Sequence, residues 1–272
     1  MLSTVTEQKQ LSTRLNLHEI DMHLHTKFSD GNCSIDTVLS CAQARGLKAV
    51  AITDHYSDKQ TLPGRMKSSA VEAYLKMLKP FNVLKGVEVD LFPQGPSISK
   101  QTTDTFDVVA GGLHQVDDVV FGCYYPKKID VKSFVETVRL TMIKAVESDL
   151  IDVLVHPLWF PETIRSQAKQ LITKDWIDSL LDAATDHQVA LEINGSWRVP
   201  NGHVVKECLK RGIKVSIGSD SHDKYTVGNT AYPLRLLKEL GATVEDVFCP
   251  DSYFSHVIEK QHKNRYAIPF TV

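Results

Sequence analysis

Short apolar runs alternate with longer amphipathic segments along this chain. Seven runs rich in Val, Ile and Leu have the length of a buried strand. They occupy residues 19–25, 48–55, 83–90, 106–114, 151–157, 189–194 and 214–222. Segments with apolar residues at helical spacing occupy residues 35–45, 67–79, 131–148, 174–187, 202–211 and 233–240. Gly46, Gly212 and Gly241 follow three of these segments, as is typical of helix C-termini.

This alternation predicts an α/β fold in which parallel strands are joined by helical crossovers. A closed barrel of seven strands accounts for the pattern, because every strand ends in a side chain that can bind a metal ion or a proton. A doubly wound open sheet would also alternate strand and helix, but only a few of its strands would contribute to one ligand crevice. Residues 91–105 contain two prolines and no helical pattern, so we expect an irregular connection there.

Side chains that can bind a metal ion stand at the ends of these runs. Six of the eleven histidines lie in such positions: His23, His25, His55, His114, His156 and His222. Because the carboxyl ends of parallel strands meet at one rim of a barrel, we expect these side chains to converge. The sequence therefore predicts a metal site at that rim.

Spacing within two motifs supports this prediction. His23 and His25 are two residues apart, so on a strand they point the same way and can bind one ion together. Asp220 and His222 repeat the spacing near the other end of the chain, next to the first strand if the barrel closes.

Three further carboxylates and one adjacent pair are also candidate ligands. Glu88 lies inside an apolar strand, where an ionised carboxylate is costly unless it is paired or meets a cation. Asp90 has the same parity but lies further out, where water could solvate it. Asp30 lies in a turn, where a ligand role and an Asx-turn are both open. Either Asp54 or His55 could be a ligand with the other orienting it, and we favour His55.

The bulk composition is that of one enzyme-sized domain. We expect residues 17–272 to form a single barrel domain and the polar residues 1–16 to form a loose tail. The formal net charge of −2 provides no basic field that would attract nucleic acid. Five widely spaced cysteines without a C-x-x-C pair suit a cytoplasmic location, and no apolar run predicts a signal peptide or membrane span.

The order of the motifs resembles that of a known family. H-L-H-T-x-x-S-D-G, I-T-D-H, G-V-E-V, G-L-H, V-H-P, E-I-N and G-S-D-S-H together are similar to the polymerase and histidinol phosphatase (PHP) family of metal-dependent phosphoesterases, over about residues 19 to 225. The resemblance implies a distorted (β/α)7 TIM-like barrel with a trinuclear metal site.

The resemblance also implies a set of nine ligands. His23, His25, Glu88 and Asp220 would hold the first metal, and Glu88 would bridge to a second held by His114 and His156. Asp30, His55 and His222 would hold the third. Imidazole and carboxylate ligands without thiolate suit two or three ions of zinc, manganese or iron.

The predicted activity is hydrolysis of a small phosphomonoester. A hydroxide shared by two metals would attack phosphorus, and the excess positive charge would attract the phosphate. Asp220 or His203 would donate a proton to the leaving group. Arg198 is the first candidate for gripping the phosphate, ahead of Lys27, Arg65 and Arg165. Asp220, His222 and Arg198 are thus the predicted catalytic residues.

Substrate identity and other functions stay open. Histidinol-phosphate phosphatases of this family usually place an arginine shortly after the histidine of the fifth strand, whereas here Trp159 and Phe160 follow His156. The long segment 56–66 is a candidate lid over the site. A 3′-5′ exonuclease or other phosphodiesterase would need a basic groove with stacking aromatics. An amidohydrolase cleaving an amide or lactone would not need Asp30, His55 or Glu88.

Overall fold

Seven parallel strands form the framework of the molecule. The computed structural model describes residues 16–59, 62–122, 129–250 and 253. The strands follow the order β1-β2-β4-β6-β9-β10-β11 in one sheet, and every neighbouring pair along this path is parallel. Their bounds are β1 Ile20–Leu24, β2 Ala49–Ile52, β4 Leu84–Phe92, β6 Val108–Gly112, β9 Val153–Leu154, β10 Ala190–Asn194 and β11 Val215–Gly218. Each of the seven apolar runs therefore contains one strand.

The sheet curls until its two edges meet. β11 and β1 are joined just beyond the ladder, where the backbone N–H of Asp220 donates to the carbonyl of His23 at 2.9 Å. The N–H of His25 donates to the carbonyl of Ser221, also at 2.9 Å, and Leu24 and Ser221 form a parallel bridge. The sheet is thus nearly closed into a seven-stranded barrel, which confirms the predicted fold class. Closure also places the first motif, which contains His23 and His25, beside the last one, which contains Asp220 and His222.

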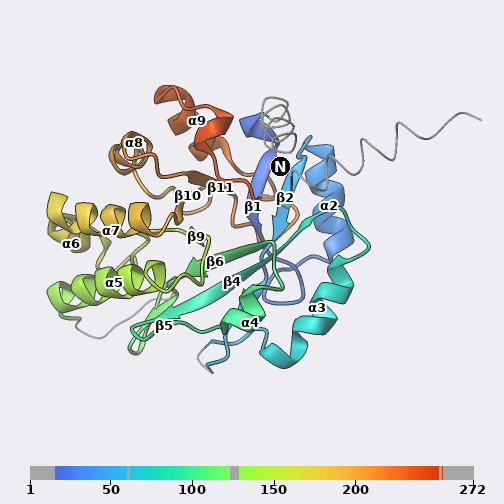
Figure 1. The fold of residues 1–272 in the computed structure, drawn as a ribbon, viewed down its shortest axis with the longest axis horizontal. Coiled ribbons are helices and arrows are strands. Elements are labelled where there is room, and N and C mark those ends of the chain that lie inside the picture. The colour runs from blue at the N-terminus through green and yellow to red at the C-terminus, as the bar shows by residue number, and fades with distance from the viewer. Residues whose placement is uncertain (1–15, 60–61, 123–128, 251–252, 254–272) are drawn as a thin grey trace, which may run out of the picture.

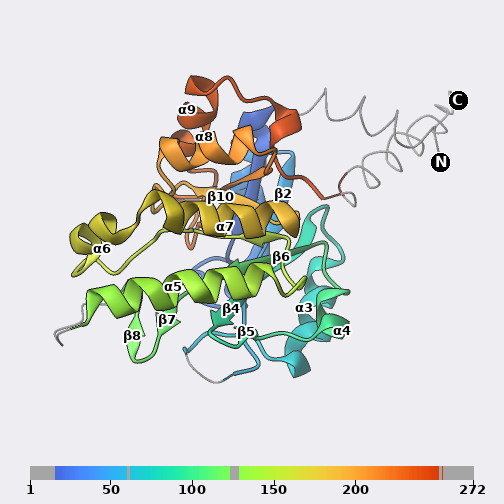
Figure 2. The same ribbon diagram turned by 60° about the vertical axis from the view of Figure 1, so that its left-hand side comes forward.

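Helices surround this sheet on its outside (Figure 1). The six predicted helices are present as α2 Ile35–Ala44, α3 Val71–Leu78, α5 Val131–Val146, α7 Lys174–Asp186, α8 Gly202–Lys210 and α9 Ala231–Glu239. Side chains of Ser34, Asp130, Thr173 and Asn201 cap four of them by accepting backbone N–H groups of the first turn. Figure 2 shows α5 and α7 lying side by side, and the indole of Trp176 on α7 donates to the carbonyl of Val135 on α5 at 3.4 Å.

Several short elements were not predicted. The connection at 91–105 is not simply irregular, because β5 Gly95–Pro96 pairs antiparallel with β4 and is followed by the one-turn helix α4 Lys100–Thr103. Helix α6 Arg165–Leu171 also adds to the expected pattern. The remaining short pieces are β3 His55–Tyr56, β7 Gln115–Val116, β8 Val119–Val120 and the 3-10 turns Leu17–Glu19, Ser68–Ala70 and Val244–Asp246. Elements of two to four residues are too short to show a hydrophobic period.

The strands are buried on both faces, as their apolar runs indicate. All residues of β1, β2, β6, β9, β10 and β11 are buried. Among the described residues no helix is both long and apolar enough to cross a bilayer. The predicted domain limits of 17–272 stay a prediction, and residues 1–15 of the predicted tail lie outside the described part of the chain.

Candidate metal centre

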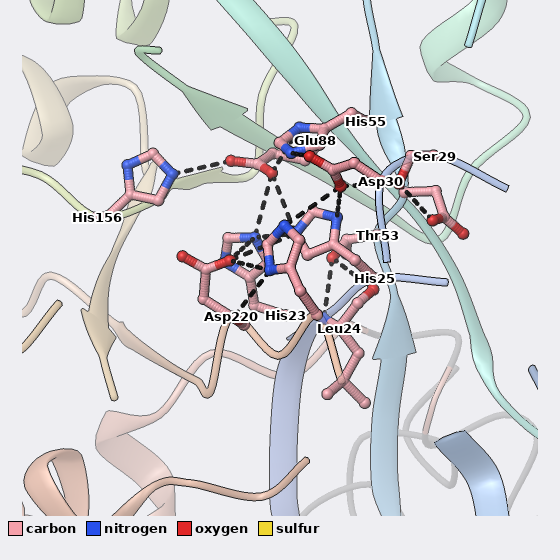
Figure 3. A network of polar contacts seen from close by, with 12 residues as sticks. His23, Leu24, His25, Ser29, Asp30, Thr53, His55, Glu88, His156 and Asp220 are labelled. Atoms are coloured by element: carbon pink, nitrogen blue, oxygen red, sulfur yellow. Dashed lines mark hydrogen bonds and ion pairs between the residues drawn. The ribbon is translucent and has the colours of Figure 1, made fainter. Parts of the chain in front are cut away.

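The predicted ligands meet at the carboxyl end of the strands. His23 and His25 come from β1, Asp30 from the turn after it, His55 from β3 and Glu88 from the middle of β4. The other four follow strands directly: His114 after β6, His156 after β9, and Asp220 and His222 after β11. In Figure 3, Glu88 lies at the top centre of the cluster with His156 to its left, and Asp220, His23 and His25 lie below it.

The carboxylate of Glu88 joins two halves of this cluster. Its Oε1 lies 2.9 Å from Nε2 of His156 and 3.0 Å from Nε2 of His114. Its Oε2 lies 3.0 Å from Nδ1 of His55 and 3.3 Å from Nε2 of both His23 and His25. One oxygen thus faces each half, which is the geometry required of a carboxylate that bridges two cations.

The donor atoms fall into compact groups. Within each group one atom from every residue lies within 4.8 Å of the others, a spacing that suits a shared ion. The groups are His23, His25 and Asp220; Glu88, His114 and His156; His25, Asp30, His55 and His222; and His55, Asp90 and His114. All nine predicted positions occur in these groups, and Asp90 is an addition to them.

Unpartnered buried atoms indicate that this donor set fits cations. His25 Nδ1, His55 Nδ1 and Glu88 Oε2 are buried and make no hydrogen bond of good geometry with the described residues, although His55 Nδ1 and Glu88 Oε2 lie 3.0 Å apart. A buried polar atom left without a partner costs about 1–3 kcal/mol. His23 and His25 also point their Nε2 atoms at each other across 3.0 Å. Metal ions would satisfy these atoms, and nitrogen and carboxylate oxygen donors suit transition metals.

Charge pairing supports the same interpretation. Burial acts to raise the pKa of Glu88, but His55, His114 and His23 together hold that pKa well below its ordinary value. Burial acts to lower the pKa of His114, yet the carboxylates of Glu88 and Asp90 raise it to about 9. Burial and the neighbouring His55 lower the pKa of His25 to about 3. Without metal ions, protons on some imidazoles balance the carboxylates, so metal binding must displace them.

Comparisons with known proteins agree with this geometry. The family model for the PHP domain matches residues 21–196. The chain belongs to the PHP domain family. A relative from Shewanella loihica named "Probable phosphatase" is 24% identical over 257 residues, which cover 90% of this chain and 95% of that protein. A "Probable phosphatase" from Citrobacter koseri is 25% identical and covers 85% and 89%. The predicted family is therefore confirmed, and the predicted phosphatase class of enzyme agrees with both relatives.

A solved structure shows the same fold. The histidinol phosphate phosphatase from Lactococcus lactis, in complex with zinc, L-histidinol and phosphate, superimposes with a TM-score of 0.58. It is 16% identical in sequence, and the match covers 85% of this chain and 99% of that one. At 16% identity this likeness shows the fold and does not identify the substrate.

Two buried carboxylates next to the predicted ligands orient some of their histidines. Glu192 on β10 accepts the Nδ1 proton of His23 at 2.7 Å with Oε1, and its Oε2 accepts the backbone N–H of His156 at 2.6 Å. Asp90 accepts from Nδ1 of His114 at 2.8 Å and is buried rather than solvated. The two ring contacts direct the Nε2 atoms of His23 and His114 towards Glu88.

Sequence reasoning gave Glu192 no role, although one signal was available. Glu192 is a carboxylate inside an apolar run, as Glu88 is, and such a residue requires a buried partner. Asp54, the neighbour of His55, accepts from the hydroxyls of Thr26 and Ser29 at 2.6 Å each, which secures the turn that carries Asp30.

Two glycines make room for these side chains. A methyl group at Gly218 would collide with Glu192 Oε1 and would lie 2.7 Å from Cβ of His23. One at Gly112 would collide with Glu88 Oε1 and with the ring of His114. Glycine is therefore required at both positions by close approach to the centre.

A cavity of about 710 Å³ opens over the predicted metal ligands. Asp30, His55, His114, His156, Asp220 and His222 all line it. Leu62, Pro63, Gly64 and Arg65 of the proposed lid segment also line it, as does Trp159. The lid function itself stays a prediction, and residues 60–61 lie outside the described part of the chain.

Of the four candidate phosphate-binding cations, one lies among the described residues that line the cavity. Arg65 borders the cavity, whereas Arg198, Lys27 and Arg165 are absent from its described lining. Arg198 has a left-handed backbone with φ of 56°, and Arg165 directs Nε to the carbonyl of Phe160 at 3.2 Å. Phe160 is fully buried in the core, so of the two aromatic residues after His156 only Trp159 reaches the cavity.

Proposed function

We propose that this protein is a metal-dependent phosphatase that hydrolyses a small-molecule phosphomonoester. The observation that carries the proposal is the single carboxylate of Glu88, which faces histidines of two donor groups with its two oxygens below an open cavity. When bound, two or three ions of zinc, manganese or iron would supply Lewis acidity and an activated water for attack on phosphorus.

The nine predicted ligands would hold these ions. His23, His25 and Asp220 form one group, His114 and His156 a second, and Asp30, His55 and His222 a third, with Glu88 shared between the first two. His25 also lies close enough to the third group to orient it. The buried atoms without partners in the cluster support this assignment.

Arg65 is the cation best placed to orient the phosphate. Its Nε lies 3.3 Å from Asp90 Oδ2, and its Nη1 lies 3.6 Å from Asp30 Oδ2, so the guanidinium stands at the rim of the centre. Planar guanidinium groups bind phosphate oxygens with two parallel hydrogen bonds. Arg65 takes the role first considered for Arg198, whose own contribution stays a prediction.

Of the two candidate proton donors Asp220 lies nearer the cavity, but it is held ionised. Burial acts to raise its pKa, yet His23 and His25 hold that pKa well below its ordinary value, so its role as proton donor stays a prediction. Asp220 lines the cavity, and its Oδ2 accepts from the indole of Trp197 at 2.8 Å. His203 lies in the first turn of α8 and is absent from the described lining of the cavity. His222 lines the cavity at its exposed edge, where it would orient a phosphate oxygen.

The composition of the cavity disfavours the two alternative activities. Arg65 is the sole Lys or Arg among the described residues that line it, whereas a nuclease requires a row of cations along the strand. Asp30, His55 and Glu88 all lie in the donor cluster, although an amide or lactone hydrolase of the amidohydrolase type would not need them.

The test combines metal analysis with phosphate release on one purified sample. Mass spectrometry would measure bound transition metals, and a panel of phosphomonoesters would be assayed with the holoenzyme. The variant His156→Ala should lose phosphate release by at least about a hundredfold, because loss of even a residue that only orients a ligand costs about 10- to 100-fold. His187→Ala, which alters a half-buried histidine paired with Asp149 away from the cavity, should retain phosphate release. Near-stoichiometric metal without release from any ester would contradict the proposal.

A further inference from the structure

One side of the cavity is an aromatic wall made of Phe121, Trp159 and Trp197. The rings of Trp159 and Trp197 are stacked, with centroids 4.2 Å apart and planes inclined by 28°. Phe121 meets Trp159 edge to face at 5.7 Å and 69°. Trp159 and Phe121 are buried, whereas Trp197 is 41% exposed. Phe121 and Trp159 therefore form the buried part of the wall, and the indole of Trp197 is its exposed part.

The aromatic wall adjoins the metal centre directly. The ring of Trp159 packs on that of His156 with centroids 5.3 Å apart, and the indole N–H of Trp197 donates to Asp220 Oδ2 at 2.8 Å. His156 and Asp220 occupy the left side of the cluster in Figure 3, and Asp30 lies on the right. The Nη1 atom of Arg65 lies 3.6 Å from Asp30 Oδ2. A phosphate between the two sides would direct its organic group towards Trp197.

Trp197 is held in place rather than loosely exposed. Its backbone N–H donates to Oδ1 of Asn194 at 2.9 Å, its indole is bonded to Asp220, and its ring rests on Trp159. Trp197, Leu140 and Tyr225 are the large hydrophobic residues exposed in the described part of the chain, and of these three Trp197 alone lines the cavity. A fixed flat indole binds a planar ring at little entropic cost.

We propose that the substrate is a phosphomonoester whose alcohol carries a planar aromatic ring, and that this ring stacks on Trp197. This inference rests on the proposed phosphatase function and names the class of its substrate. The cavity volume of about 710 Å³ accommodates a ring of this kind beside the phosphate. Stacking of a ring on a protein aromatic side chain typically changes affinity by about tenfold or more.

A matched pair of ligands tests the inference without requiring turnover. The phosphonates 3-phenylpropyl phosphonate and 3-cyclohexylpropyl phosphonate have the same linker and similar bulk, and only the first is planar. Isothermal titration calorimetry on the metal-loaded full-length protein should show about two- to tenfold tighter binding of the phenyl compound, because the cyclohexyl ring buries similar area and lacks only the aromatic contribution. Equal dissociation constants, or tighter binding of the cyclohexyl compound as for an aliphatic or sugar substrate, would overturn the inference.

Variants assign the preference to Trp197. Trp197→Leu should reduce the phenyl preference to about onefold, and Trp197→Phe, which keeps an aromatic face without the indole N–H, should retain part of it. Tyr225→Leu changes an exposed aromatic residue outside the cavity and should keep the wild-type ratio. A phenyl preference that persists in Trp197→Leu would refute the role of this residue, with thermal unfolding checked for each variant.

The two proposals fail separately. Phosphate release by the wild-type holoenzyme from 2-phenylethyl and 2-cyclohexylethyl phosphate tests the phosphatase function, because their alcohols have similar leaving-group chemistry. Absence of release from both these and the wider panel would reject the phosphatase, while the ratio of phosphonate affinities would still decide whether the aromatic wall selects a planar ring.

Discussion

Replacement of Glu192 by glutamine should weaken metal binding through the tautomer of His23. Glu192 is fully buried, and its Oε2 accepts from two groups that can only donate there, the N–H of His156 at 2.6 Å and the amide Nδ2 of Asn194 at 2.9 Å. Asn194 cannot flip to relieve the contact, because its Oδ1 accepts the N–H of Trp197. A glutamine must therefore keep its oxygen on this side.

The amide NH2 of the variant then faces Nδ1 of His23. In the wild type this nitrogen donates to Glu192 Oε1 at 2.7 Å, which leaves the lone pair of the neutral ring on Nε2. In Glu192→Gln, Nδ1 must accept instead, so the proton moves to Nε2. That atom faces Glu88 Oε2 at 3.3 Å and Asp220 Oδ1 at 3.7 Å, where a metal ion would require the lone pair.

The expected loss in metal affinity is about 10- to 100-fold, the range for residues that orient a ligating histidine. This corresponds to about 1.4–2.8 kcal/mol. Competition with a chromophoric chelator would measure the affinity, and denaturant unfolding of the metal-free protein would show whether the fold persists. Asp107→Asn is the control, since this carboxylate accepts the N–H of Lys85 at 2.9 Å near the start of β4. Unchanged metal affinity in Glu192→Gln would refute the tautomer argument.

Three further substitutions test a close contact at the centre, a buried hydroxyl beside it and a helix cap away from it. Gly112→Ala should lower the bound metal per chain measured by mass spectrometry, because its methyl group would displace Glu88; a full complement would contradict this. Tyr74→Phe removes the buried hydroxyl that accepts the N–H of Asp54 at 3.2 Å, and urea unfolding should show a loss of about 1–3 kcal/mol; an unchanged midpoint would refute it. Asn201→Ala removes the cap of α8 and should cost about 1 kcal/mol in the same assay while phosphate release stays at the wild-type rate.

The sequence by itself determined the barrel and the nine donor side chains that gather at its rim. Apolar runs of strand length can be read locally, because a strand buried on both faces needs apolar side chains throughout. The polar residue at the end of each run then marks the rim of the barrel. The two-residue spacing of His23 and His25 places both on one face of β1 whatever the rest of the chain does. Helices as long as α5 and α7 are likewise predictable from their period.

Tertiary structure alone decided how side chains meet around that centre. Elements as short as β5 and α4 form through contacts with β4 and the cap of Ser99, which leave no period in the sequence. The pairing of Glu192 with His23, 169 residues apart, depends on strand order and register. The same holds for the place of Arg65 at the cavity and for the stack of Trp197 on Trp159. Local patterns determine which residues are buried or polar, but distances between remote side chains are set when the barrel closes.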